Sequence, residues 1–224
     1  LSMFRFLCQI LFWIFPWFIR RRCLTWAYGY HIDSTAHIGF SIILAKKLWM
    51  EANSSIGHLC ICKKIDRLEL HESASMGNLN KITGFPTNDS SVIHFHHVKD
   101  RKCELIIGKH TGITSNHYFD CNGGIRIGAF CQIAGFEPAF MTHSIDLNRS
   151  IQDAGPIEIG DYCFIGARCI LLKGVKIADK TAISAMSLVN KSLTTSNALY
   201  GGVPCKFLKD LGEAKFFSRE IGFV

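Results

Sequence analysis

The stretch "IEIGDYCFIGARCILLKGVKIADKTAISAMSLV", residues 157–189, contains the most regular repeat of the sequence. A small residue usually follows each of its regularly spaced aliphatic residues, which occupy every sixth position: Ile159, Ile165, Leu171, Ile177, Ile183 and Val189. A period of six fits neither a helix, which has 3.6 residues per turn, nor a simple strand, which has a period of two. It indicates a solenoid in which three short strands and their turns form a coil of about eighteen residues, with the aliphatic side chains stacked inside.

The same spacing occurs earlier in the chain, in stretches that begin at Ile32, Leu70, Ile107 and Ile127. It is interrupted near residues 85–104 and again near residues 136–157. Interruptions of a regular coil predict loops that leave it, and loops on a rigid scaffold often carry functional residues. We therefore expect an all-β solenoid over residues 31–191 with two loop insertions.

Residues 1–30 are expected to form an N-terminal helical segment that is hydrophobic and basic. Its apolar run, from Phe6 to Ile19, contains Pro16 and is shorter than the ~20 residues that a membrane-spanning helix needs. Three arginines follow at 20–22, with tryptophans on both sides. Such a composition suits peripheral contact of residues 3–26 with an anionic membrane surface. The alternative is a helix packed on its own domain or on a neighbouring subunit.

The C-terminal segment, residues 192–224, departs from the repeat. Gly201, Gly202 and Pro204 predict a turn. The pattern after Lys206 predicts a short amphipathic helix, which we expect to cap the open end of the solenoid because a repeat protein must cover its last coil.

The composition limits the partners that the protein can have. The chain has 224 residues, 48% of them hydrophobic, and a net charge of +7. A hydrophobic content this high excludes a disordered chain, and the basic charge favours anionic partners such as a membrane surface or a phosphorylated cofactor. The sequence contains no zinc-finger, homeodomain or RNP-type signature, so we expect no nucleic-acid partner.

The ten cysteines do not form a disulfide framework. The sequence contains no C-x-x-C pair and shows no cleavable signal peptide. Cys131, Cys163 and Cys169 occupy one recurring position of the repeat, where other copies carry Thr or Ser. We interpret them as small buried residues in a reducing compartment, which predicts a cytoplasmic protein, including one on the cytoplasmic face of a membrane.

The stretches "THSIDLNRSIQDAGPIEIGDYCFIGARC", from Thr142, and "YGGVPCKFLK", from Tyr200, carry a resemblance to a known family. The chain resembles the hexapeptide-repeat acyltransferases over about residues 31–210. This family includes galactoside and maltose O-acetyltransferases and polysaccharide O-acetyltransferases. The resemblance implies a left-handed parallel β-helix, a homotrimer, and transfer of an acetyl group from acetyl-CoA to a hydroxyl.

The resemblance also implies a catalytic residue, because His143 matches the histidine that the family places on a loop before its "IG" coil. A sugar hydroxyl is a poor nucleophile at neutral pH, and an imidazole with a pKa near 6.5 can accept its proton during direct attack on the thioester. Such a base needs a partner that fixes its orientation. Asp146 is the nearest candidate, and a main-chain carbonyl would serve equally well.

Further residues are carried over from the family's motifs. Phe164 stands where an aromatic residue borders the acceptor, and His117 and Arg149 are further candidates for substrate contact. The residues implied to contact acetyl-CoA are Ala167, Ala185, Asn190, Lys191, Lys206 and Lys209. Lysines near the nucleotide suit its phosphate charges. One departure stands out: "SAMS" replaces the family's "GAGS", so that Met186 occupies a glycine position.

The acceptor implied by the family is a glycan or sugar, and we expect a role in cell-surface polysaccharide or lipopolysaccharide synthesis. Three alternatives remain open. One is N-acylation of an amino sugar, and another is a catalytically silent scaffold docked to a membrane. The third is a zinc hydratase of the γ-carbonic-anhydrase type, which would need three histidines that converge between subunits, with His110, His117 and His143 as the candidates. The acyltransferase interpretation predicts no metal.

Overall fold

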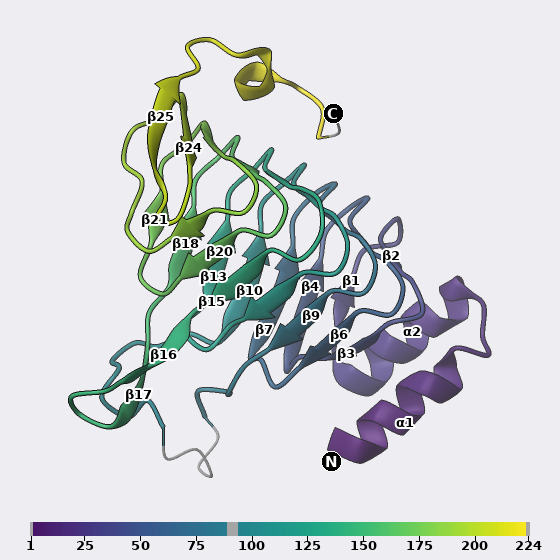
Figure 1. The fold of residues 1–224 in the computed structure, drawn as a ribbon. Helices are drawn as coiled ribbons and strands as arrows, with labels where there is room; N and C mark the ends of the chain where they lie inside the picture. Colours follow the sequence, from purple (N-terminus) through teal and green to yellow (C-terminus); the bar gives the residue numbers. More distant parts are fainter. Residues whose placement is uncertain (1, 89–93, 223–224) are drawn as a thin grey trace.

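A computed structural model describes residues 2–88 and 94–222, which form a solenoid with three faces (Figure 1). Face A contains β1 (His31–Ile32), β4 (Lys47–Met50), β7 (Arg67–Leu70), β10 (Glu104–Ile107), β13 (Ile125–Ile127), β18 (Ile157–Ile159) and β21 (Lys176–Ile177). Face B contains β2 (His37–Ile38), β5 (Ser55–Ile56), β8 (Ser75–Met76), β11 (Gly112–Ile113), β14 (Gln132–Ile133), β19 (Phe164–Ile165), β22 (Thr181–Ile183), β24 (Ala198–Gly201) and β25 (Lys206–Asp210). Face C contains β3 (Ile42–Leu44), β6 (Ile61–Lys63), β9 (Lys81–Thr83), β12 (Tyr118–Asp120), β15 (Ala139–Met141), β20 (Ile170–Leu172) and β23 (Leu188–Val189).

Consecutive coils pair in parallel, and this pairing stacks the repeat's aliphatic residues inside the solenoid. On face B, for example, Ile133 lies opposite Ile165, which in turn lies opposite Ile183. All three side chains are fully buried. Each aliphatic residue is therefore covered by its equivalents in the coils before and after it. The predicted left-handed parallel β-helix of hexapeptide repeats is confirmed.

The chain turns at three corners in every coil, and one of these corners carries both long insertions. We call it the C–A corner, because it joins a strand of face C to the next strand of face A. Residues 84–88 and 94–103 lie outside the solenoid between β9 and β10, and residues 142–156 leave it between β15 and β18. The coil between them crosses the same corner with residues 121–124 alone. The two insertions therefore flank a short corner.

The N-terminal segment forms two helices, α1 (Ser2–Phe12) and α2 (Trp17–Tyr28), which pack against the first coil. Pro16 precedes α2, and Gly29 ends it in the left-handed conformation. The Gln9 amide accepts a hydrogen bond from the Ile43 backbone N–H at 2.8 Å and donates to the Ile43 carbonyl at 2.5 Å. Arg20 is buried and donates to the carbonyls of Ile38 and Gly39. Within the described residues, no helix combines the length and apolar character required to cross a membrane.

The C-terminal segment does not form the expected capping helix. Residues Lys206–Asp210 form strand β25, which runs antiparallel to β24. In the described part of the chain after β25, the only helical piece is the 3-10 turn η1 (Lys215–Ser218). The prediction from amphipathic periodicity was wrong because β24 leaves a row of backbone hydrogen-bonding groups at the end of face B, and a strand satisfies them where a helix would not.

The stacked core predicts a sharp contrast between neighbouring residues of β20. The Leu171 side chain is fully buried, whereas the Ile170 side chain is 42% exposed. We expect Leu171→Ala to lower the free energy of unfolding by about 2–5 kcal/mol, because it opens a cavity in the stack. We expect Ile170→Ala to cost much less. Denaturant unfolding followed by circular dichroism measures both, and equal losses would contradict the inward stacking of Leu171.

Candidate functional site

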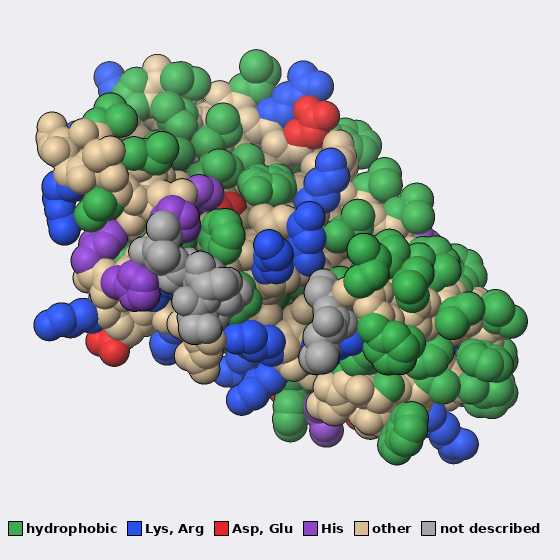
Figure 2. Space-filling model, turned by 90° about the horizontal axis from the view of Figure 1, so that it is seen from below, with side chains coloured by type: hydrophobic (Ala, Val, Ile, Leu, Met, Phe, Trp, Pro, Cys, Tyr) green, Lys and Arg blue, Asp and Glu red, His purple; other side chains and the backbone are tan. Residues whose placement is uncertain are grey.

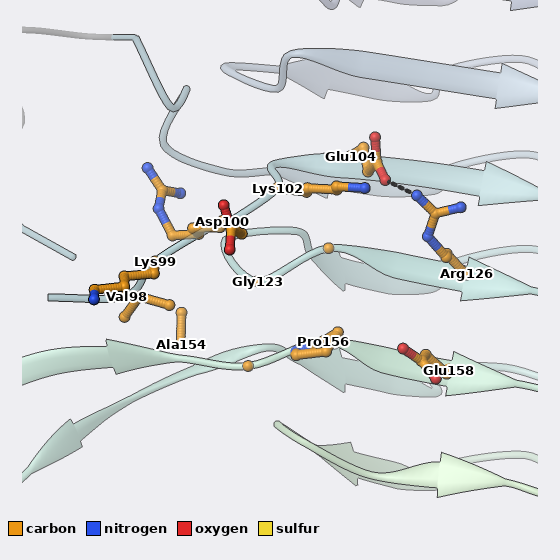
Figure 3. A pocket seen from close by; sticks show the side chains of 13 residues that line it. Val98, Lys99, Asp100, Lys102, Glu104, Gly123, Arg126, Ala154, Pro156 and Glu158 are labelled. Carbon is orange, nitrogen blue, oxygen red and sulfur yellow. Dashed lines mark hydrogen bonds and ion pairs between the residues drawn. The ribbon is translucent and has the colours of Figure 1, made fainter. Parts of the chain in front are cut away.

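The candidate site lies at the C–A corner, between the two insertions. A cavity of about 220 Å³ opens there. Figure 3 shows Lys99 and Asp100 of the first insertion on one side of the cavity, Gly123 of the short corner beside them, and Ala154 and Pro156 of the second insertion opposite. Two of the cavity residues lie next to neighbours of His143. Gly123 follows Asn122, whose side chain lies 3.2 Å from Nδ1 of His143, and Ala154 pairs with His143 across a hairpin.

The second insertion is a β-hairpin that fixes the backbone of His143. Strand β16 (His143–Asp146) pairs antiparallel with β17 (Ile151–Ala154). At the tip, the Asp146 carboxylate accepts hydrogen bonds from the backbone N–H groups of Asn148, at 3.0 Å, and Arg149, at 3.2 Å. This is the local turn that an aspartate favours. Asp146 therefore shapes the hairpin, and it does not bond to His143.

The partner of His143 is Asp120, at the end of β12 in the preceding coil. Nδ1 of His143 donates to Oδ2 of Asp120, and the backbone N–H of His143 donates to the same oxygen at 3.1 Å. Asp120 is 1% exposed, and its Oδ1 accepts from the Asn122 side chain at 2.6 Å. These bonds assign the proton to Nδ1 and leave Nε2 as the acceptor nitrogen. None of the hydrogen bonds among the described residues uses Nε2 of His143, whose side chain is 32% exposed.

Residues 121–124 of the short corner link the hydrogen-bonded pair of Asp120 and His143, which we call the dyad, to both insertions. Thr142 donates to the Asp120 carbonyl at 2.6 Å and accepts from the Gly123 backbone N–H at 2.8 Å. The Asn122 side chain accepts from the Phe85 backbone N–H at 2.7 Å, at the start of the first insertion. Every one of these groups is satisfied by a neighbour, so the geometry of Asp120 and His143 is held from several sides.

The first insertion adds an aromatic wall beside the dyad. The ring of Phe95 meets the His143 ring edge to face, with 6.3 Å between centroids. The Arg101 guanidinium lies 4.8 Å from the Phe95 centroid and also donates to the carbonyls of Phe85 and Asn122. Burial by this wall opposes protonation of His143. The hydrogen bond to Asp120 acts the other way and dominates, so that it raises the pKa of His143 above its ordinary value, with the charge of Asp120 adding to the rise.

Two of the other predicted substrate residues lie away from this dyad. His117 is 1% exposed inside the solenoid, and its Nδ1 donates to the Ser115 carbonyl at 2.9 Å. Burial lowers the pKa of His117, so it is a neutral structural histidine. Its repeat position points inward, and the hypothesis that it contacts substrate stays a prediction. Arg149 is exposed at the hairpin tip.

The residues that the resemblance assigns to cofactor binding lie in three parts of the solenoid. Ala167 and Ala185 stack in successive coils at the corner between faces B and C, which we call the B–C corner, where the Ala167 carbonyl accepts from the Met186 N–H at 2.8 Å. Lys206 and Lys209 are exposed on β25, at the end of face B. Asn190 and Lys191 instead follow β23 at the C–A corner.

Phe164 lies on face B, across the solenoid from the C–A corner. It packs edge to face against Phe216 of η1, with 5.9 Å between ring centroids. Within one chain, neither Phe164 nor the B–C corner adjoins His143. The three histidines of the zinc alternative also separate, because His110 stacks on Phe130 at the A–B corner, where face A leads into face B, while His117 lies inside. Among the described residues, no three His, Cys, Asp or Glu side chains form a metal-binding group.

No model of a known family matches the chain. A Staphylococcus aureus (strain COL) protein named "Putative acetyltransferase" is 31% identical over 131 residues, which cover 56% of this chain and 64% of that protein. A chloramphenicol acetyltransferase of Morganella morganii is 32% identical over 142 residues, covering 61% of this chain and 63% of its own. The chain thus spans just under two thirds of the length of these relatives.

Among solved structures, a hexapeptide-repeat acetyltransferase of Vibrio cholerae superimposes with a TM-score of 0.46 at 31% identity, covering 49% of this chain and 64% of its own. A galactoside acetyltransferase in complex with coenzyme A superimposes with a TM-score of 0.43 at 13% identity, covering 93% of this chain and 82% of its own. The chain resembles hexapeptide-repeat acetyltransferases in sequence, and its strand pairing gives the fold independently of these superpositions.

The dyad predicts the titration of His143. Its pKa is expected above the ordinary value of ~6.5, and Asp120→Asn is expected to lower it, because the variant removes both the charged acceptor and the charge. Since the folded-state pKa is raised, the stabilisation from this pair is fully present below about pH 6.5 and is lost as the pH rises through the folded value. Histidine ring NMR signals followed across pH measure the shift, with Asp146→Asn as the matched control that leaves it unchanged.

Proposed function

We propose that the protein transfers an acetyl group from acetyl-CoA to a hydroxyl of a sugar, in the synthesis of a cell-surface polysaccharide or lipopolysaccharide. The observation that carries this proposal is the Asp120–His143 dyad, in which Nδ1 of the imidazole is held by Asp120 and Nε2 has no hydrogen-bond partner among the described residues. Sequence similarity to proteins named as acetyltransferases supports the same reaction class.

In this reaction, Nε2 of His143 accepts the proton of the acceptor hydroxyl while its oxygen forms a bond to the thioester carbonyl carbon. The carbon–sulfur bond then breaks, and the imidazolium returns the proton to the leaving sulfur. Asp120 stays ionised and stabilises the imidazolium in between, which is the role of an orienting carboxylate. Thr142 and Asn122 act only on the dyad, by holding Asp120 and the short corner in place.

The B–C corner fits a thioester donor with a long, narrow arm. Ala167 and Ala185 present small side chains there, and a Cβ at Gly135 would meet Cβ of Ala167 at 2.4 Å, so the stack is close-packed as well as small. The exposed lysines Lys206 and Lys209 of β25 would hold the phosphates. Met186, which is 67% exposed, borders this corner and would narrow the space beside the acyl group.

The two corners require a partner chain to complete the site. Within one chain Ala167 and Ala185 lie at a different edge of the solenoid from His143. We therefore propose a homotrimer in which the C–A corner of one protomer faces the B–C corner of the next. This assembly gives each site one dyad and one donor corner, contributed by two protomers.

The activities of single variants distinguish the role of Asp120 from that of Asp146. We expect His143→Ala to lower kcat/KM by about 10²–10⁴-fold, the usual contribution of a general base. Asp120→Asn is expected to lower kcat and to move the acidic limb of the pH profile to lower pH, since it lowers the pKa of the base. Asp146→Asn keeps both close to wild type. Release of free thiol from acetyl-CoA, across a panel of glycans and amines, measures each rate and distinguishes oxygen from nitrogen acceptors.

Mixed oligomers test the shared site. His143→Ala and Ala185→Trp are each expected to lower activity strongly when expressed alone, because one removes the base and the other blocks the donor corner. Co-expression of the two variants is expected to restore thiol release, because some sites then combine an intact dyad with an intact donor corner. Co-expression of His143→Ala with Asp120→Asn restores nothing, because both defects lie at the same corner. Restoration by both pairs, or by neither, would contradict the trimer.

A further inference from the structure

Helix α1 has its polar and apolar sides reversed relative to a helix on a water-exposed surface. Its inward side carries Arg5 and Gln9, which bond to Tyr30 and Ile43 of the first coil. Its outward side presents large apolar side chains to the surroundings. The exposed apolar residues of α1 and the turn after it are Met3, Phe4, Phe6, Leu7, Ile10, Leu11, Ile14 and Phe15. A helix facing water shows the opposite arrangement.

Helix α2 adds exposed aromatic side chains to this segment, and neither helix contains an acidic residue. Phe18 is 62% exposed and Trp26 is 90% exposed, which is an extreme value for so large an aromatic side chain. Residues 2–30 contain no Asp or Glu. Of the three consecutive arginines, Arg20 and Arg21 are used to bond backbone carbonyls of the solenoid, and Arg22 is exposed. We call this exposed surface of α1 and α2, with Trp26 and Arg22, the helical patch.

The helical patch faces the same side of the molecule as the candidate site. Figure 1 shows α1 and the hairpin of β16 and β17 projecting from the same lower side of the solenoid, near its two ends. Figure 2, seen from below, shows the apolar patch and the histidines of the insertion region on one face, with Lys and Arg side chains between them. Lys46 and Lys64 lie on the stretch of the C–A corner that separates the two regions. The hairpin adds exposed Ile145 and Leu147 to this face.

A lipid surface explains these features together. A protein partner usually meets a patch with polar groups around it, whereas the exposed side chains of α1 between residues 3 and 12 are all apolar. A bilayer interface accepts apolar side chains at the level of the acyl chains, tryptophan at the headgroups, and cations beside anionic lipid. The apolar arc of α1, with Trp26 and Arg22 of the adjoining helix α2, provides these three elements.

We propose that the helical patch lies in the interface of an anionic lipid bilayer and holds the C–A corner over the bilayer surface. In this orientation the hairpin tip, with Ile145 and Leu147, is the second point of contact. This docking does not depend on the proposed function. Its consequence for the acceptor does rest on that function: the sugar that reaches His143 is then one attached to a lipid.

Vesicle binding tests the docking without acetyl-CoA or sugar, so that its failure is distinct from failure of the acetyl-transfer proposal. The full chain is mixed with vesicles of phosphatidylcholine, or of phosphatidylcholine with phosphatidylglycerol, and floated on a density gradient. We expect binding to both, with stronger binding to the anionic vesicles that added salt reduces. Leu7→Asp with Leu11→Asp is expected to weaken binding by roughly tenfold or more, because two charges enter the apolar arc.

The matched control places two aspartates at exposed apolar residues near the other end of the chain, Val203→Asp with Ile221→Asp, and is expected to bind like wild type. Circular dichroism confirms that both double variants fold. A second measurement needs no charge change: lipids brominated in the acyl chain are expected to quench tryptophan fluorescence, and Trp26→Phe is expected to lose part of the quenching. Absence of wild-type binding, or equal binding by both double variants, would overturn the proposal.

A second copy of the chain is the competing occupant of the patch. If the patch joined two copies, light scattering would show a larger mass for wild type than for Leu7→Asp with Leu11→Asp, and wild type would not float with vesicles. That result would replace the lipid surface by a self-association interface. We expect equal masses for the two proteins.

Discussion

The stacking of each coil on the next is the constraint on which the rest of the structure depends. Every inward position of the repeat is occupied by a side chain that touches its equivalents above and below, as Ile133, Ile165 and Ile183 show. A coil cannot shift along its neighbour without moving these residues out of register. Insertions that carry functional side chains are therefore accommodated at the corners, where the chain can lengthen without disturbing the stack.

The same register determines the geometry of the dyad. Asp120 pairs with Met141 in neighbouring strands of face C, so the hairpin that starts just after Met141 begins beside the Asp120 carboxylate. Gly123 lets the second insertion pass close to the short corner, because a Cβ at this position would lie only 2.4 Å from the Gly155 carbonyl oxygen. A rigid scaffold thus positions a base on a loop, which is the combination that precise proton transfer requires.

The sequence predicted the solenoid and the loop histidine because both are local signals: a fixed period and a break in it. It did not predict the partner of His143, because Asp120 lies one coil earlier and approaches only through register. The motif "DCNGG", an aspartate before a short corner with two glycines, is the signal that could have identified it. The burial of His117 follows from its repeat position, whereas its role as a substrate contact stays a prediction. The cytoplasmic location and the trimer stay predictions, because they concern surroundings that one chain does not contain.

The reversed direction of β25 has a consequence for the length of the molecule. In a parallel solenoid the last strand of a face resembles the first strand of another coil, so identical molecules can add end to end. Here the edge of face B is already occupied by a strand running the opposite way, from Lys206 to Asp210. A coil from a second molecule that arrived at this edge would meet an antiparallel neighbour with charged side chains, and its repeat could not continue. The reversed strand β25 therefore prevents a second molecule from continuing the solenoid on face B.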